Sequence, residues 1–140
     1  PPELAGDIAI GSRSLPESRW LMRGTPAHRK VTGWVFNRLT RLLVPGVNDT
    51  QCGFKMFRRD VARKVFSQSV VEGWAFDVEI LYLARLYGYL VKEVPVPWTY
   101  DANSRVNVLG DSLDMAADLL RIWIRGKTGG YEPQKDPAHA

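Results

Sequence analysis

The sequence contains one cysteine, two histidines and no uninterrupted run of eighteen apolar residues. A single cysteine excludes an internal disulfide and fits a reducing compartment without proving one. His28 and His139 have no partner at a spacing typical of a zinc site or a catalytic triad. Without a long apolar run, no segment is expected to span a bilayer. Asp-x-Asp and glycine-rich phosphate-loop motifs are absent as well, so the chain offers no recognisable metal motif.

Charge is distributed unevenly along the 140 residues. Residues 1–65 carry twelve Lys and Arg against five Asp and Glu, a balance of +7, whereas residues 66–140 carry seven against ten, a balance of −3. A basic first half suits anionic partners such as phosphates, nucleotide diphosphates, acidic lipid headgroups or nucleic acid. For most individual Lys and Arg, an ordinary solvated surface is the simpler interpretation.

Apolar residues alternate between strand-like and helix-like spacing, which predicts an α/β domain with an incomplete sheet. Strands are expected at residues 7–10, 52–57 and 90–96. Helices are expected at residues 33–43, after a cap at Asp60, and at residues 76–87 and 109–124. Pro95 and Pro97 place the last strand at a sheet edge or strand end. Residues 14–30 are predicted to form a mobile loop, residues 100–107 a polar loop, and residues 127–140 a disordered tail.

Helical spacing also predicts which side chains face the core. The four expected apolar stripes are Val35, Leu39, Leu42 and Leu43; Val61, Val65 and Phe66; Phe76, Ile80, Leu83, Ala84 and Tyr87; and Leu109, Leu113, Ala116, Leu120, Trp123 and Ile124.

Three segments combine glycine, polar residues and apolar flanks, a composition typical of functional loops. They are Ile8-Ala9-Ile10-Gly11-Ser12-Arg13, Asp49-Thr50-Gln51-Cys52-Gly53-Phe54-Lys55 and Gly73-Trp74-Ala75-Phe76-Asp77-Val78-Glu79. In this order and spacing, they resemble the acceptor-side half of family 2 glycosyltransferases, closest to the dolichyl- or polyprenyl-phosphate glucosyltransferases and mannosyltransferases. The resemblance covers the chain from about Asp7 to about Arg125.

The resemblance implies a partial GT-A-type three-layer α/β fold, of which residues 1–126 form the carboxy-terminal, acceptor-side portion. It implies inverting transfer of a hexose, with glucose favoured, from a nucleotide-diphosphate sugar to a polyprenyl or dolichyl phosphate. Family members bind the nucleotide on an amino-terminal half and hold Mg²⁺ or Mn²⁺ through an Asp-x-Asp motif. Because this chain lacks that motif, it is expected to contain no metal ligands and to be inactive alone, whereas a full-length enzyme would use the metal.

The same resemblance implies roles for several cations. Arg13 and Arg29 would meet the phosphate of the lipid carrier, Ser12 would shape the turn beside them, and Arg105 would close over the diphosphate. The planar guanidinium fork matches phosphate oxygens bidentately. Arg23 or Lys30 could take the place of Arg29. A surface salt bridge for Arg13 and a plain exposed position for Arg105 remain alternative interpretations.

The resemblance also implies a sugar pocket lined by Asp49, Gln51, Gly53, Trp74 and, in a weaker supporting role, Glu79. Asp77 matches the acid near the acceptor nucleophile in inverting relatives. A phosphate acceptor is already ionised at neutral pH, so Asp77 would orient sugar or acceptor rather than take a proton. Alternatively, Asp49 could simply cap a turn. A carboxylate such as Asp77 in the first turn of a helix is also favoured by the helix dipole regardless of function.

The resemblance further implies a cytoplasmic protein, peripheral at the inner face of the membrane. Residues 20–22 and Trp34, interleaved with arginines, suit an interface with anionic lipid, although they could equally pack against a missing half. One alternative is a non-catalytic basic binding module; nucleic acid is a disfavoured partner because no helix-turn-helix, zinc or aromatic sheet motif is present. Another is an orphan fragment stabilised as a homodimer through an open sheet edge.

Overall fold

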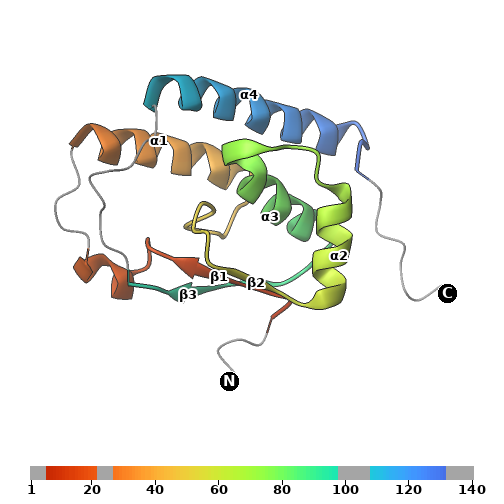
Figure 1. Ribbon diagram of the computed structural model, residues 1–140, viewed down its shortest axis with the longest axis horizontal. Coiled ribbons are helices and arrows are strands. Elements are labelled where there is room, and N and C mark those ends of the chain that lie inside the picture. Colours follow the sequence, from red (N-terminus) through yellow and green to blue (C-terminus); the bar gives the residue numbers. More distant parts are fainter. Residues whose placement is uncertain (1–5, 22–26, 98–107, 132–140) are drawn as a thin grey trace.

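The computed structural model describes residues 6–21, 27–97 and 108–131. In chain order its elements are β1 (Ile8–Ser12), the 3₁₀ helix η2 (Pro16–Leu21), α1 (Ala27–Leu43), β2 (Lys55–Phe57), α2 (Arg59–Gln68), the 3₁₀ turn η3 (Gly73–Ala75), α3 (Phe76–Leu86), β3 (Val91–Pro95) and α4 (Val108–Lys127). The predicted mixed α/β architecture is therefore present. The strands form one layer, with α1, α3 and α4 on one side of it and α4 outermost (Figure 1).

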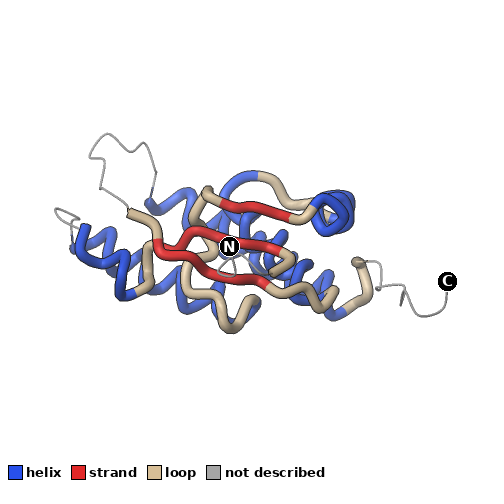
Figure 2. Tube along the Cα trace, turned by 90° about the horizontal axis from the view of Figure 1, so that it is seen from below, coloured by secondary structure: helices blue, strands red, loops and turns tan. Residues whose placement is uncertain are grey.

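The sheet has three strands in the order β2-β1-β3 (Figure 2). β1 pairs antiparallel with β2, where Ile10 lies opposite Lys55, and parallel with β3, where Ser12 lies opposite Pro95. The prediction of an edge position for the proline-containing strand is confirmed. β2 is shorter than expected and begins at Lys55, although the N–H of Gly11 still donates to the carbonyl of Phe54 at 2.7 Å.

Helix α3 lies at the centre of the core. Its buried side chains Val78, Ile80, Leu81 and Leu83 belong to one cluster with the strand residues Ile8 and Ile10. The predicted stripe of α3 is confirmed except at Phe76, which is only partly buried. Gly88 follows the helix with φ 74°, a left-handed conformation that favours glycine and ends the helix.

The predicted inward faces of α1 and α4 are wrong in large part. Of the α1 stripe only Leu43 is buried, and Val35, Leu39 and Leu42 are exposed. Among the described side chains of α4, the buried apolar ones are Leu119 and Ile122, neither of which belongs to the predicted stripe; the side chain of Leu109 lies outside the described part. Of the predicted α4 stripe, Leu113, Ala116, Leu120, Trp123 and Ile124 are exposed. Both helices carry apolar residues on more than one side, and spacing alone does not say which side meets the sheet.

Other local predictions also need correction. Residues 14–30 are not simply a loop, since they contain η2 and the first turn of α1, which begins at Ala27 rather than Gly33. Asp60 lies within the first turn of α2, whose N-cap position is Arg58. Phe66 is largely exposed, although its ring lies 5.3 Å from that of Phe57.

The chain remains ordered beyond the predicted start of the tail at residue 127, because α4 ends at Lys127 and Tyr131 is buried. Residues 132–140 and the predicted loop at 100–107 lie outside the described residues. Within the described ranges, no helix combines the length and apolar character needed to cross a bilayer.

Candidate functional site

Arg13 and Asp49 form a two-pronged ion pair at the carboxyl end of β1. Arg13 Nε donates to Asp49 Oδ2 at 2.7 Å, and Arg13 Nη2 donates to Asp49 Oδ1 at 2.9 Å. The backbone N–H of Arg13 donates to Oδ2 as well, at 2.9 Å. The carboxylate therefore holds both the turn after the strand and one edge of the guanidinium. Ligands of open α/β sheets bind at such strand ends.

Each partner keeps the other charged. The hydrogen bond to Asp49 is the main reason that the pKa of Arg13 is raised. Burial alone would raise the pKa of Asp49, but the hydrogen bonds and charge of Arg13 outweigh burial, and the pKa of Asp49 is lowered. The charge of Asp77 also contributes to the raised pKa of Arg13, so that carboxylate belongs to the same electrostatic cluster.

Glu93 of β3 holds the backbone of Asp49 in place through hydrogen bonds. Its Oε1 accepts from the backbone N–H of Asp49 at 3.0 Å, and its Oε2 accepts from Asn48 Nδ2 at 2.7 Å. Arg41 of α1 in turn donates to Asn48 Oδ1 at 2.7 Å. The segment that carries Asp49 is thus fixed to both β3 and α1.

A second ion pair joins Lys55 of β2 to Asp77 of α3. Lys55 Nζ lies 2.8 Å from Asp77 Oδ1, and the same ammonium donates to the carbonyl of Cys52. The Lys55 side chain is 6% exposed, whereas that of Asp77 is 31% exposed and can still meet a ligand. The acid implied as catalytic therefore has a buried cation beside it.

The sequence reasoning missed Lys55, Glu93 and Asn48. Lys55 is the last residue of the Asp49–Lys55 run, and Glu93 is a single acid within a short edge strand. A charged side chain in a strand that packs on a core needs a partner, because burying an unpaired charge is costly. The position of Lys55 and Glu93 in predicted strands could therefore have identified them as members of ion pairs or hydrogen bonds.

The remaining sugar-pocket candidates lie on adjacent loops. Gln51 Nε2 donates to the carbonyl of Trp74 at 2.8 Å, which links the segment after α1 to the turn before α3. The indole of Trp74 is half-exposed, and Gly53 is exposed with open space where a side chain would stand. Three separate contacts therefore hold these candidates: Arg13 with Asp49, Gln51 with Trp74, and Lys55 with Asp77.

The phosphate-site candidates are only partly described. Ser12 is buried, and its carbonyl accepts from Ser18 Oγ at 2.6 Å and from the N–H of Val96 at 3.3 Å, consistent with a role in shaping the turn. Arg29 lies in the first turn of α1, but its side chain lies outside what the structure describes. Arg105 lies outside the described residues altogether.

Glu79 does not face the candidate site. Its side chain is fully buried and accepts from Ser69 Oγ at 2.6 Å, from the N–H groups of Val70 and Val71 at 3.0 and 2.9 Å, and from Tyr131 Oη at 2.8 Å. A sugar could reach this carboxylate only after several of these bonds were broken. The geometry therefore corrects the supporting sugar-pocket role implied for Glu79 and gives it a structural one.

Chemically, the site presents two cations and two carboxylates at the junction of β1, β2 and α3. Guanidinium and ammonium groups can hold phosphate, and the half-exposed indole beside a carboxylate suits a sugar ring. Within residues 6–21, 27–97 and 108–131, no group of three His, Cys, Asp or Glu side chains is placed to bind a metal ion.

Curated proteins similar to the chain share one name. The chain is 44% identical over 125 residues to "Dolichyl-phosphate beta-glucosyltransferase" of Homo sapiens, covering 89% of this chain. The proteins of that name from Dictyostelium discoideum and Saccharomyces cerevisiae are 40% and 34% identical, over 84% and 91% of this chain. No family model matches the chain, and no solved structure matches it significantly.

The similarity covers most of this chain but only part of each relative. The chain spans 38% of the human protein, 36% of the Dictyostelium protein and 39% of the yeast protein. Identities of 34–44% over most of the chain nevertheless confirm the resemblance carried by its three polar segments. The chain therefore belongs with the dolichyl-phosphate glucosyltransferase-like glycosyltransferases of family 2, and it spans less than half of the length of the relatives that it matches.

Proposed function

We propose that the chain forms the acceptor-side part of an enzyme that transfers glucose, with inversion, from a nucleotide-diphosphate sugar to a polyprenyl or dolichyl phosphate. The observation that carries this proposal is the similarity of 84–93% of the chain to proteins named dolichyl-phosphate beta-glucosyltransferase. The two ion pairs Arg13–Asp49 and Lys55–Asp77 support it, because ligands of open α/β sheets bind beyond the carboxyl ends of the strands and guanidinium groups can hold phosphate.

The proposed fold is the carboxy-terminal portion of a GT-A-type three-layer domain. A three-stranded sheet with helices on one side supports this proposal, since a complete layered α/β domain covers both faces of its sheet. The nucleotide and its Mg²⁺ or Mn²⁺ would bind to the part of the enzyme that lies outside this chain.

In the proposed reaction, an oxygen of the acceptor phosphate attacks the anomeric carbon of the sugar. The bond from that carbon to the nucleotide diphosphate breaks, and the diphosphate leaves with the electron pair. The acceptor phosphate is already an anion, so no side chain has to remove a proton. Arg13, held in orientation by Asp49, would bind phosphate, and Asp77 beside Lys55 would orient the sugar or the acceptor.

The proposed location is cytoplasmic, at the inner face of the membrane where the lipid acceptor is embedded. Exposed apolar side chains on the outer surface of α1, including Val31, Trp34 and Leu42, support a peripheral contact with a bilayer.

The test compares the 140-residue chain with the longer protein encoded by the DNA that includes sequence upstream of Pro1. Each is incubated with UDP-glucose, a polyprenyl phosphate and Mg²⁺. We expect turnover by the longer protein only, with a loss of about 100-fold or more in Asp77→Ala and Arg13→Gln variants, typical of groups that orient or stabilise the reacting phosphate. Robust turnover by the 140 residues alone, or an unchanged rate in both variants, would contradict the proposal.

A further inference from the structure

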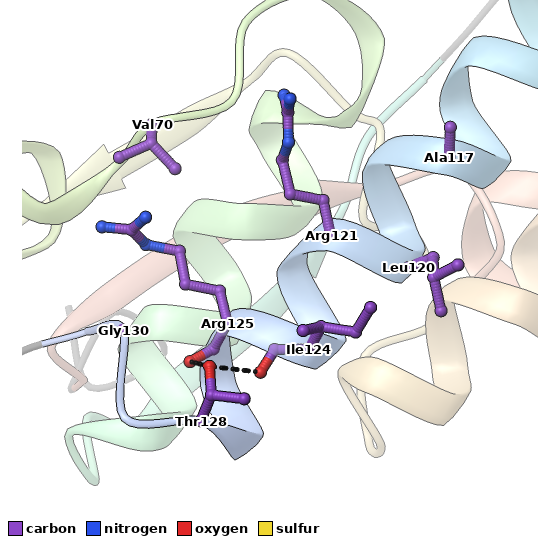
Figure 3. Close-up of a pocket in the computed structure, with 8 residues that line it drawn as sticks. All are labelled: Val70, Ala117, Leu120, Arg121, Ile124, Arg125, Thr128 and Gly130. Atoms are coloured by element: carbon purple, nitrogen blue, oxygen red, sulfur yellow. Dashed lines mark hydrogen bonds between the residues drawn. The ribbon is translucent and has the colours of Figure 1, made fainter.

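A hollow of about 720 Å³ lies on the other side of the core from the β1 strand end, along the carboxy-terminal half of α4. Its lining consists of Val70, Ala117, Leu120, Arg121, Ile124, Arg125, Thr128 and Gly130. Figure 3 shows the guanidiniums of Arg121 and Arg125 on the side of α4 that faces Val70. Two arginines and several apolar groups therefore share one surface, and no carboxylate is among the described residues that line it.

Among the described residues, the contact that positions Arg125 is with the ring of Tyr131, and no carboxylate pairs with it. Its guanidinium carbon lies 5.2 Å from the ring centroid of Tyr131, a cation–π contact that occupies a face of the planar group and neutralises none of its charge. Its Nε is buried and has no hydrogen-bond partner among the described residues. A guanidinium that is positioned, and that no described carboxylate neutralises, can bind an anionic ligand.

Arg121 contributes less. Its Nη1 lies 3.7 Å from Asp118 Oδ1, a long and largely exposed contact that neutralises part of its charge. Asp118 lines a neighbouring hollow together with Glu72 and Asp114, so negative charge gathers on that side. The anion site is accordingly centred on Arg125, with Arg121 at its edge.

Arg121 and Arg125 lie near the carboxyl end of α4. The carboxyl end of a helix carries partial negative charge, which by itself favours cations there. The helix dipole alone therefore accounts for the presence of arginines at this end of α4. The unpartnered Nε of Arg125 and the apolar walls are not explained by the helix dipole.

The apolar walls indicate what kind of anion fits. Leu120 and Ile124 line the hollow and are also exposed, and Trp123 and Leu113 of the same helix are exposed as well. A free phosphate gains nothing from such a surface, whereas the headgroup of a lipid brings its apolar chains with it. From this combination we propose that the α4 hollow binds the phosphate of an acidic membrane lipid, with Arg125 as its principal contact.

This proposal rests on the proposed function. It adds to the membrane contact through α1 a second surface, the α4 hollow, which binds lipid headgroups. The experiment measures binding of the 140-residue chain to phosphatidylcholine vesicles with and without phosphatidylglycerol, by co-sedimentation. We expect binding to the acidic vesicles, reduced about fivefold by Arg125→Gln and less by Arg121→Gln, as expected for one basic side chain at a charged surface. The matched control, Arg59→Gln/Arg63→Gln on exposed positions of α2, removes two charges elsewhere and is compared with Arg121→Gln/Arg125→Gln.

Three results would overturn the proposal: no preference for acidic vesicles, equal loss in the two double variants, or displacement from vesicles by millimolar inorganic phosphate at constant ionic strength. The last result would assign the hollow to a soluble anion. Circular dichroism confirms that each variant is folded, and Arg125→Lys, which keeps the charge but not the fork, is expected to bind between wild type and Arg125→Gln. Normal vesicle binding with no glucose transfer by the longer protein would refute the proposed function alone.

Discussion

The hydroxyl of Tyr131 donates a 2.8 Å hydrogen bond to the carboxylate of Glu79, across a separation of 52 residues and within the buried core. This contact ties the turn that follows α4 to the first turns of α3. It also gives residues 128–131 a specific place in the fold, although their composition suggests disorder. The buried carboxylate thus organises segments that would otherwise be connecting loops.

Replacement of Tyr131 by Phe should lower stability and remove an alkaline transition. Burial, followed by the bond to Glu79, raises the pKa of Tyr131 above its usual value near 10. The raised pKa stabilises the fold fully below pH 10, and this contribution is lost as pH rises above 10, because the unfolded chain then releases the phenolic proton more readily. We expect Tyr131→Phe to lower the free energy of unfolding by about 1–3 kcal/mol at pH 7 and to flatten its dependence on pH above 10. Urea titrations at pH 7 to 11 measure the free energy of unfolding and its dependence on pH, with Tyr89→Phe as control.

Glu79→Gln should be much more destabilising than a surface change of the same kind. The amide would place an N–H₂ group against donors that now point at a carboxylate oxygen. Buried groups left without a partner cost about 1–3 kcal/mol each, and more when the group is charged. We expect a loss of about 3 kcal/mol, whereas Glu72→Gln on the exposed loop should change stability by less than about 0.5 kcal/mol. Equal effects in thermal unfolding would contradict the structural role of Glu79.

Two glycine-to-alanine changes in helices should have opposite effects. A Cβ at Gly126 would lie 1.9 Å from Tyr82 Oη and 2.6 Å from Tyr82 Cζ, so the ring would have to move. We expect Gly126→Ala to destabilise the protein by about 1–3 kcal/mol. At Gly33, in the middle of α1, a Cβ would meet nothing within 4 Å, and alanine should stabilise the helix by up to about 1 kcal/mol. Differential scanning calorimetry of the two variants measures both changes, and a Gly126→Ala protein as stable as wild type would contradict the close packing at Tyr82.

The Arg13–Asp49 pair should make stability fall at acid pH. Because the pKa of Asp49 is lowered in the folded state, its contribution is present above the unfolded value near 3.9 and is lost as pH falls below that value. We expect a coupling energy of about 1–3 kcal/mol at pH 7 in a double-mutant cycle of Arg13→Gln and Asp49→Asn. Asp49→Asn should also weaken the acid dependence between about pH 5 and pH 2. A coupling near zero would show that the pair is no more than a solvated contact.

Elements whose apolar pattern allows only one position in the fold could be predicted from the sequence. Helix α3 is apolar on most sides and can only lie at the centre, so its residues and its end at Gly88 were predicted correctly. The hydrophobic run from Ile8 to Ile10 likewise had to be a buried strand. The candidate site was visible as three motifs, because loops that share a sheet end must combine polar groups with glycine.

The buried faces of α1 and α4 and the contacts of Glu93 could not be predicted, because they depend on residues that are distant in the sequence. α1 and α4 have apolar residues on several sides, and which side is buried depends on neighbours rather than on spacing. The hydrogen bonds from Asn48 and Asp49 to Glu93 connect residues about 45 positions apart, a pairing fixed only when β3 joins the sheet. Glu79 and Asp77 are two residues apart, yet one is sealed in the core and the other faces the candidate site, because successive helical positions point in different directions.

The central position of β1 has a consequence for synthesis of the protein. Its parallel neighbour is β3, and the contact between Asp7 and Leu90 spans 83 residues. On a ribosome that adds about 5–20 residues per second, the first strand waits roughly 4–16 seconds for that neighbour to emerge. During this interval Ile8 and Ile10 would be open to chaperones, and slower translation of the intervening codons should increase their capture.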